Sequence, residues 1–168
     1  MKTMCQYKTG LIGLLAVSVV IFLSSSVHAE KMKITGKNKS VRIISQTTGD
    51  PGDKEGHMLM QTVTLSQTTS SNENWNDIRM VDTQQSDQMG ENGTHTGYGY
   101  HMHKGGDRTF FKYWGSQKAA GAGMMSLEGK YEWTGGTGRF QNIKGGGTYT
   151  CKGTMSSNEC DWEGEVEY

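Results

Sequence analysis

This chain of 168 residues has little proline, no excess of positive or negative charge and few long apolar stretches. It has one proline, and Lys+Arg equals Asp+Glu at 17 each, so the formal net charge is zero. A chain without excess positive charge is not suited to electrostatic capture of nucleic acid or of an anionic lipid surface. Four tryptophans, seven tyrosines and four phenylalanines argue against a disordered chain. The length suits one domain with a real core.

The first 29 residues have the three parts of a secretory signal peptide. Lys2 and Lys8 give a basic start, Leu11 to Leu23 is uncharged and mostly apolar, and Val27-His28-Ala29 resembles a cleavage site. An uncleaved membrane anchor is the alternative, but the apolar run is shorter than the roughly 20 residues of a spanning helix. We therefore predict a secreted or periplasmic protein with no stable membrane span after cleavage at Ala29.

Cysteine is also scarce, with three residues in the chain. Cys5 would leave with the leader, and Cys151 and Cys160 would remain as a pair in an oxidising compartment. A disulfide is the plain expectation. The spacing is not C-x-x-C and no histidine is close in sequence, which disfavours a redox-active or metal-binding pair.

No sustained helical periodicity occurs after residue 40. Residues 30–40, with four lysines and little apolar content, are expected to be a flexible lead-in, and 41–168 a β-barrel domain. Short alternating runs separated by Gly, Asn, Asp and Ser predict eight strands, near 41–47, 57–67, 77–84, 94–104, 108–115, 125–134, 145–152 and 160–168. Glycines inside the strands allow tight bending, so we expect an all-β fold with almost no helix. A single eight-stranded antiparallel barrel is favoured over a sandwich.

Two hairpins predict which side chains face inward. If Gly105-Gly106 is a two-residue turn, Tyr98 and Tyr100 share the inner face with Phe111 and Tyr113, and the neighbouring histidines face outward. If Cys151 lies opposite Cys160, the aromatic residues of the last two strands face inward and the acids outward. The predicted cavity residues are Tyr98, Tyr100, Phe111, Tyr113, Tyr131, Trp133, Tyr149 and Trp162.

One segment supports a family resemblance. Residues 129–149 place Gly-Gly-Thr-Gly-Arg-Phe (135–140) before an Ile-x-Gly-x-Gly-Thr-Tyr strand (143–149). This pattern resembles the signature of allene oxide cyclase-like and dirigent-like β-barrels. Lys-Gly-Gly-Asp (104–107), followed by Phe110 and Phe111, resembles the preceding hairpin of that group, and Asp53-Lys-Glu-Gly-His57 resembles its uncharacterised secreted bacterial members.

The resemblance implies an eight-stranded antiparallel barrel of calycin type. Its members include cyclases, whose cavity holds an apolar epoxide derived from a fatty acid, and proteins that direct stereochemistry. The catalytic carboxylate of the cyclases has no match here. The acids of the expected strands, such as Glu132, Glu163 and Glu165, are predicted to face outward.

Histidine gives the one metal hypothesis. His101 and His103 are two apart on an expected strand and therefore share a face, and His95 or His57 could be a third ligand for Zn²⁺ or Cu²⁺. Solvent-facing histidines beside Arg108 are the alternative reading, and no cofactor is expected.

Three functions remain open at this point. The first is a binder of a small apolar or aromatic molecule, and the second is an isomerase or cyclase acting on an apolar substrate. The third is a structural barrel that uses its outer surface. A titratable group that is buried beside a cavity would favour the enzyme, whereas a binder needs only the cavity.

Overall fold

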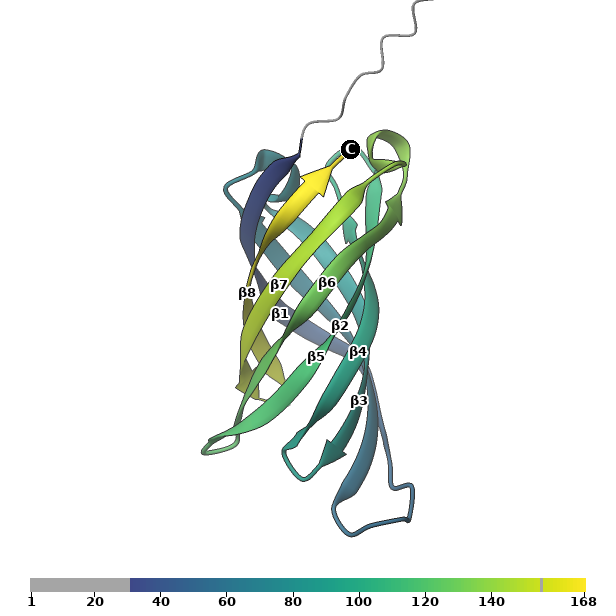
Figure 1. Ribbon diagram of the computed structural model, residues 1–168, viewed down its shortest axis with the longest axis vertical. Helices are drawn as coiled ribbons and strands as arrows, with labels where there is room; N and C mark the ends of the chain where they lie inside the picture. Colours follow the sequence, from purple (N-terminus) through teal and green to yellow (C-terminus); the bar gives the residue numbers. More distant parts are fainter. Residues whose placement is uncertain (1–30, 155) are drawn as a thin grey trace, which may run out of the picture.

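The computed structural model describes residues 31–154 and 156–168. These residues form a closed barrel of eight strands in which each strand pairs antiparallel with its sequence neighbour, and β1 pairs with β8 (Figure 1). The strands are β1 (Met32–Gly49), β2 (His57–Ser70), β3 (Ile78–Met89), β4 (Asn92–Met102), β5 (Arg108–Gly121), β6 (Met124–Gly136), β7 (Lys144–Thr154) and β8 (Ser157–Glu167). The expected all-β, eight-stranded antiparallel barrel is confirmed.

Helical structure in the described part of the chain is limited to two short 3₁₀ turns, η1 (Glu73–Trp75) and η2 (Gly138–Phe140). None of the described helices is long and apolar enough to cross a membrane. The predicted signal peptide, 1–29, lies outside the described residues.

The prediction that residues 30–40 form a flexible lead-in is wrong, because β1 begins at Met32. Ile34 is buried, and the lysines alternate with it on the outer face against the acids of β8. Lys37 lies 2.8 Å from Asp161, for example. The sequence does not show an alternation of apolar and polar residues here, because the inward positions after Ile34 are Gly36, Asn38 and Ser40, which are not apolar.

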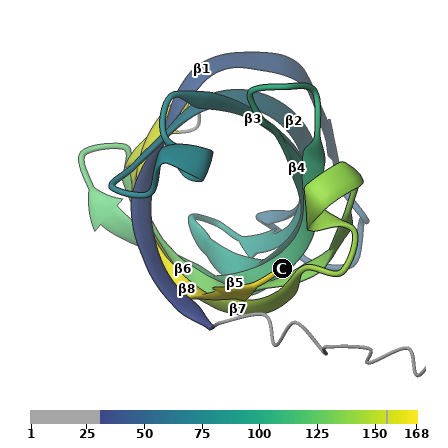
Figure 2. The same cartoon turned by 90° about the horizontal axis from the view of Figure 1, so that it is seen from above.

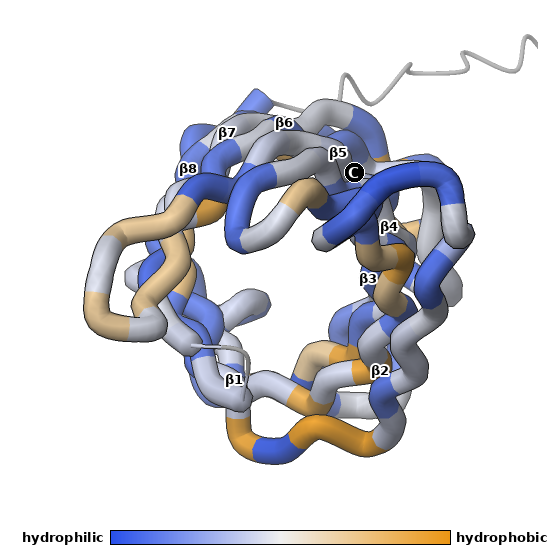
Figure 3. The backbone as a smooth tube through the Cα atoms, turned by 90° about the horizontal axis from the view of Figure 1, so that it is seen from below, coloured by the Kyte–Doolittle hydropathy of each residue, from blue (hydrophilic) through white to orange (hydrophobic). Residues whose placement is uncertain are grey.

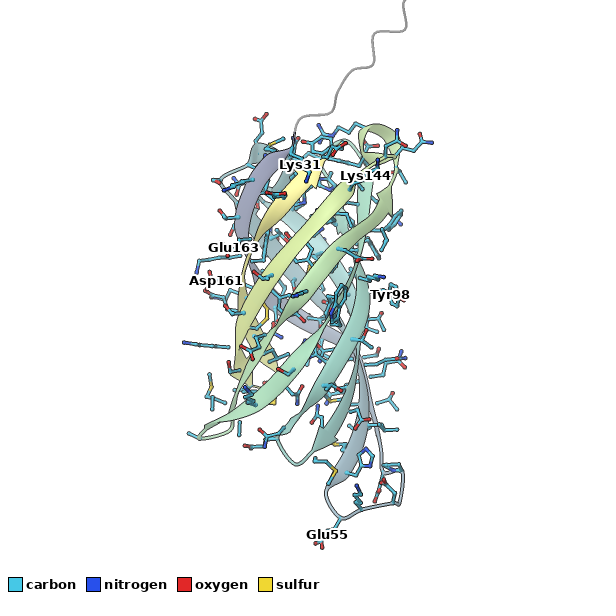
Figure 4. The ribbon with its side chains drawn as sticks, in the orientation of Figure 1. Lys31, Glu55, Tyr98, Lys144, Asp161 and Glu163 are labelled. Carbon is cyan, nitrogen blue, oxygen red and sulfur yellow. A yellow bond between two sulfur atoms is a disulfide. The ribbon has the colours of Figure 1, made fainter. Side chains whose placement is uncertain are left out.

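The predicted register of the β4–β5 hairpin is wrong by one residue. The loop between the strands has three residues rather than two, since the backbone N–H of His103 donates to the carbonyl of Asp107. Met102 therefore pairs with Arg108, and a shift of one residue turns every β4 side chain to the opposite face. Tyr98 and Tyr100 face outward, and Tyr98 is 67% exposed (Figure 4).

The register of the last hairpin is confirmed. Cys151 pairs with Cys160 and the two form a disulfide, while Tyr149 pairs with Trp162. The acids of β8 face outward, as Figure 4 shows for Asp161 and Glu163. A disulfide is compatible with an extracellular or periplasmic location.

One end of the barrel is closed by aromatic side chains. Viewed from above, the loop that carries η1 turns in over the mouth of the barrel, and the loop that carries η2 lies beside it (Figure 2). Trp75 from η1 and Phe140 from η2 are fully buried, with ring centroids 5.5 Å apart. We call Trp75, Phe140 and Ile143 the plug. The opposite end carries the β1–β2, β3–β4, β5–β6 and β7–β8 turns, and no described residue covers it in this way.

Candidate functional site: a two-sided cavity in the barrel

A cavity of about 140 Å³ lies inside the barrel, away from the plug. It extends from His101 and Trp133 in the middle of the barrel to Thr154 and Asn158 beside the β7–β8 turn. Figure 3 views the barrel from this unplugged end. Every strand contributes inward side chains to the lining.

Aromatic rings form one wall of the cavity because glycines on neighbouring strands leave room for them. A Cβ atom on Gly99 would lie 2.4 Å from the ring of Phe111, and one on Gly97 would lie 2.3 Å from the ring of Tyr113. The same relation holds between Gly129 and Tyr149 and between Gly36 and Trp162, and a Cβ atom on Gly164 would lie 2.6 Å from the hydroxyl of Tyr131, two strands away. The rings therefore pack against the backbone of the barrel wall.

The opposite wall is polar. The inward positions of β1, β2 and β3 in this region carry mainly hydroxyl and amide side chains, namely Asn38, Ser40, Thr62, Thr64, Ser66 and Gln84. A molecule in the cavity would thus meet aromatic faces on one side and hydrogen-bonding groups on the other.

Asp82 of β3 is the one carboxylate that lines the cavity in the described part of the chain. The hydroxyl of Tyr113 donates a hydrogen bond of 2.7 Å to its Oδ2. Burial raises the pKa of Asp82 to about 6, and the bond from Tyr113 opposes this shift. The carboxyl group of Asp82 therefore titrates close to neutral pH.

Sequence reasoning missed Asp82, although a signal was present. Along β3, Ile78, Met80, Asp82 and Gln84 are spaced by two and must share a face. The first two are buried, so the carboxylate on the same face points into the barrel.

His95 and Tyr149 form a second polar pair in the barrel, with 2.5 Å between Nε2 and the hydroxyl. Burial lowers the pKa of His95 to about 4. It also lowers that of His101, to about 3, with a further contribution from the charge of His103. His95 and His101 are therefore uncharged at neutral pH.

His95, His101 and His103 are buried, so the alternative reading of these three histidines as solvent-facing residues is wrong. His101 and His103 both contact the hydroxyl of Thr109, at 3.3 and 3.0 Å. His95 instead contacts Tyr149. His57 lies at the unplugged end between Asp53 and Asp87. The described residues contain no group of three His, Cys, Asp or Glu side chains placed to hold a metal ion.

Six of the eight predicted aromatic residues line the cavity, and two do not. The six are Phe111, Tyr113, Tyr131, Trp133, Tyr149 and Trp162. Tyr98 and Tyr100 lie on the outer surface because of the register shift described above. The guanidinium of Arg108 lies 5.0 Å from the ring centroid of Tyr100 there.

Comparison with protein-family models finds no match, and no curated protein matches the sequence either. The resemblance to allene oxide cyclase-like barrels remains an expectation from the residues alone.

Proposed function

We propose that this protein is an exported β-barrel that binds a small aromatic or apolar molecule inside the barrel. The observation that carries the proposal is the cavity of about 140 Å³ with an aromatic wall. An engineered apolar cavity of about 150 Å³ is large enough to bind benzene. The allene oxide cyclase-like ancestry and the signal peptide are parts of the same proposal and rest on the sequence.

The placement of the glycines supports a binding role over a solid core. The three atoms nearest to an added Cβ at Gly99 belong to the side chains of Phe111 and Asp82, so a barrel that only needed to be stable could carry a larger residue there. In this barrel, Phe111, Tyr113 and Tyr149 instead lie over Gly99, Gly97 and Gly129. The wall is covered by rings while the axis of the barrel stays open.

Native mass spectrometry of the protein purified from its own host tests the proposal. We expect an added organic mass that is lost when the same sample is denatured. Thr62→Trp should abolish this added mass, since Thr62 lines the cavity, whereas the matched variant Thr94→Trp on the outer face should retain it. A bare mass in the unaltered protein would contradict binding and favour a role for the outer surface.

A second function, that of an isomerase or cyclase, is favoured by Asp82. A carboxyl group with a pKa of about 6, held by Tyr113 beside a cavity, can act as a general acid or base at neutral pH. If the molecule recovered from the native protein is turned over, Asp82→Asn should abolish turnover even at concentrations that saturate the cavity. Equal turnover by Asp82→Asn would contradict catalysis by this residue.

A further inference from the structure

The side chains that line the cavity can carry negative charge but no positive charge at neutral pH. Its lining contains no lysine or arginine within the described residues, and its carboxylate is Asp82. The other titratable groups in it are neutral near pH 7. Burial keeps the pKa of His101 low and raises the pKa of Tyr113, Tyr131 and Tyr149. Any net charge inside the cavity at neutral pH is therefore negative.

Asp82 has no cation beside it in the described structure. No ion pair of the described residues includes Asp82, and within the described structure its side chain accepts one hydrogen bond, from Tyr113. Its surroundings are Thr64 of β2 and Gly99 of β4, which pair with it, and the neighbouring tyrosines 113 and 149. A buried carboxylate without a counter-charge is costly, and a cationic ligand would remove that cost.

The aromatic wall suits the same kind of ligand. The faces of Trp133, Trp162, Tyr131, Tyr149 and Phe111 carry the negative side of the ring quadrupole, and cavities of this type bind ammonium groups through cation–π contacts. An anion would instead have to enter beside the carboxylate of Asp82. The buried indole N–H groups of Trp133 and Trp162 have no hydrogen-bond partner among the described residues and are the feature that would favour an anion, so the experiment includes one.

We propose that the cavity selects a small organic cation, an amine on an aromatic or apolar body, with the ammonium group at Asp82 and the body against the aromatic wall. This inference rests on the proposed binding function and specifies its ligand class. It extends that function to a carboxylate that was not among the candidate residues of the sequence.

Three probes of similar shape test the charge preference. 2-Phenylethylamine is the cation, n-propylbenzene the neutral isostere and 3-phenylpropionate the anion. Each is titrated into the full-length purified protein, with tryptophan fluorescence as the signal. We expect 2-phenylethylamine to bind at least about tenfold more tightly than either of the other two.

Two asparagine variants locate the source of the preference. Asp82→Asn should remove the advantage of 2-phenylethylamine and leave the affinity for n-propylbenzene unchanged. Asp161→Asn makes the same change on the outer face and should leave all three affinities unchanged, since Asp161 is exposed and paired with Lys37.

The pH dependence adds an independent check. 2-Phenylethylamine stays protonated between pH 5 and 7.5, so a change in its affinity reports on the protein. Protonation of Asp82, whose pKa is about 6, should weaken its binding about tenfold from pH 7.5 to pH 5. The affinity for n-propylbenzene should stay constant over the same range.

The outcomes separate this inference from the function on which it rests. Equal or tighter binding of n-propylbenzene or 3-phenylpropionate would overturn the cation preference and leave the binding function standing. An advantage of 2-phenylethylamine that survives Asp82→Asn would overturn the role of Asp82. Failure of all three probes, together with a bare native mass, would overturn both proposals.

Discussion

At the scale of single residues, Asp82 lowers the stability of the barrel while serving the proposed site. Its pKa in the folded protein, about 6, is above the ordinary value of 3.8 because burial disfavours the charged form. The contribution of Asp82 to the free energy of unfolding is fully present below pH 3.8 and is lost as the pH rises through 6. A group retained for folding alone would not be expected to behave in this way.

Asp82→Asn should therefore stabilise the protein at neutral pH. The amide can still accept the hydrogen bond from Tyr113, and it carries no charge to desolvate. We expect a gain on the order of 2 kcal/mol in the free energy of unfolding at pH 7.5, and almost none at pH 4, measured by urea denaturation. A variant that is less stable than the parent at both pH values would contradict the account.

Gly99→Ala should destabilise the barrel and reduce the cavity. The new methyl group would lie 2.4 Å from Phe111 and 3.0 Å from Asp82, so the ring would have to move toward the barrel axis. We expect a loss of about 1–3 kcal/mol by urea denaturation. Gly49→Ala is the matched control, because no described residue other than its two chain neighbours has an atom within 4 Å of its Cβ position. Equal effects of the two substitutions would show that the ring contact is unimportant.

The residues of the site were predictable where alternation was strong. Tyr131 and Trp133 are spaced by two between polar neighbours, and Tyr149 faces Trp162 across a register fixed by the cysteines. Asp82 was not predicted, because one carboxylate on a strand that mixes Met, Thr and Gln looks like any outward acid.

At the scale of strands and hairpins, two physical features limited prediction from the sequence. The Gly-Gly pair, with φ of 94° at both residues, fits a two-residue turn and a three-residue loop equally well, and that choice reverses the faces of β4. The first nine residues of β1 have inward positions that are mostly small or polar, so hydrophobic alternation could not reveal them. The last hairpin was predicted correctly because three independent features agreed on one register.

The disulfide joins β7 to β8 at the cavity wall, and its loss should be measurable. A Cys151→Ala/Cys160→Ala double variant should lose about 2–3 kcal/mol of stability, because a loop of roughly ten residues is no longer closed in the unfolded chain. Urea denaturation with and without reductant measures this. The reductant should lower the stability of the parent protein and leave the double variant unchanged. An unchanged parent would contradict a stabilising role.

At the scale of the whole molecule, the plug and the cavity occupy different levels along the barrel axis. The plug closes one end with fully buried aromatic side chains, and the cavity occupies the part toward the opposite end. A ligand of the proposed kind would therefore enter from the end opposite Trp75 and Phe140.

Ile143→Val tests this separation. Ile143 is buried in the plug and does not line the cavity. We expect a loss of about 0.5–1.5 kcal/mol in the free energy of unfolding and no change in the affinity for 2-phenylethylamine by fluorescence titration. Weaker binding that parallels the loss of stability would show that plug and cavity act as one unit.

The most direct test of the cavity uses the tryptophans themselves. Trp133 and Trp162 line the cavity, Trp114 is 41% exposed on the outer face, and Trp75 belongs to the plug. The measurement is the NMR spectrum of ¹⁵N-labelled indole groups, assigned with single Trp→Phe variants, during titration with 2-phenylethylamine. The account predicts that the signals of Trp133 and Trp162 move while that of Trp114 stays. A shift of Trp114 alone, or no shift at saturating probe, would contradict a binding site inside the barrel.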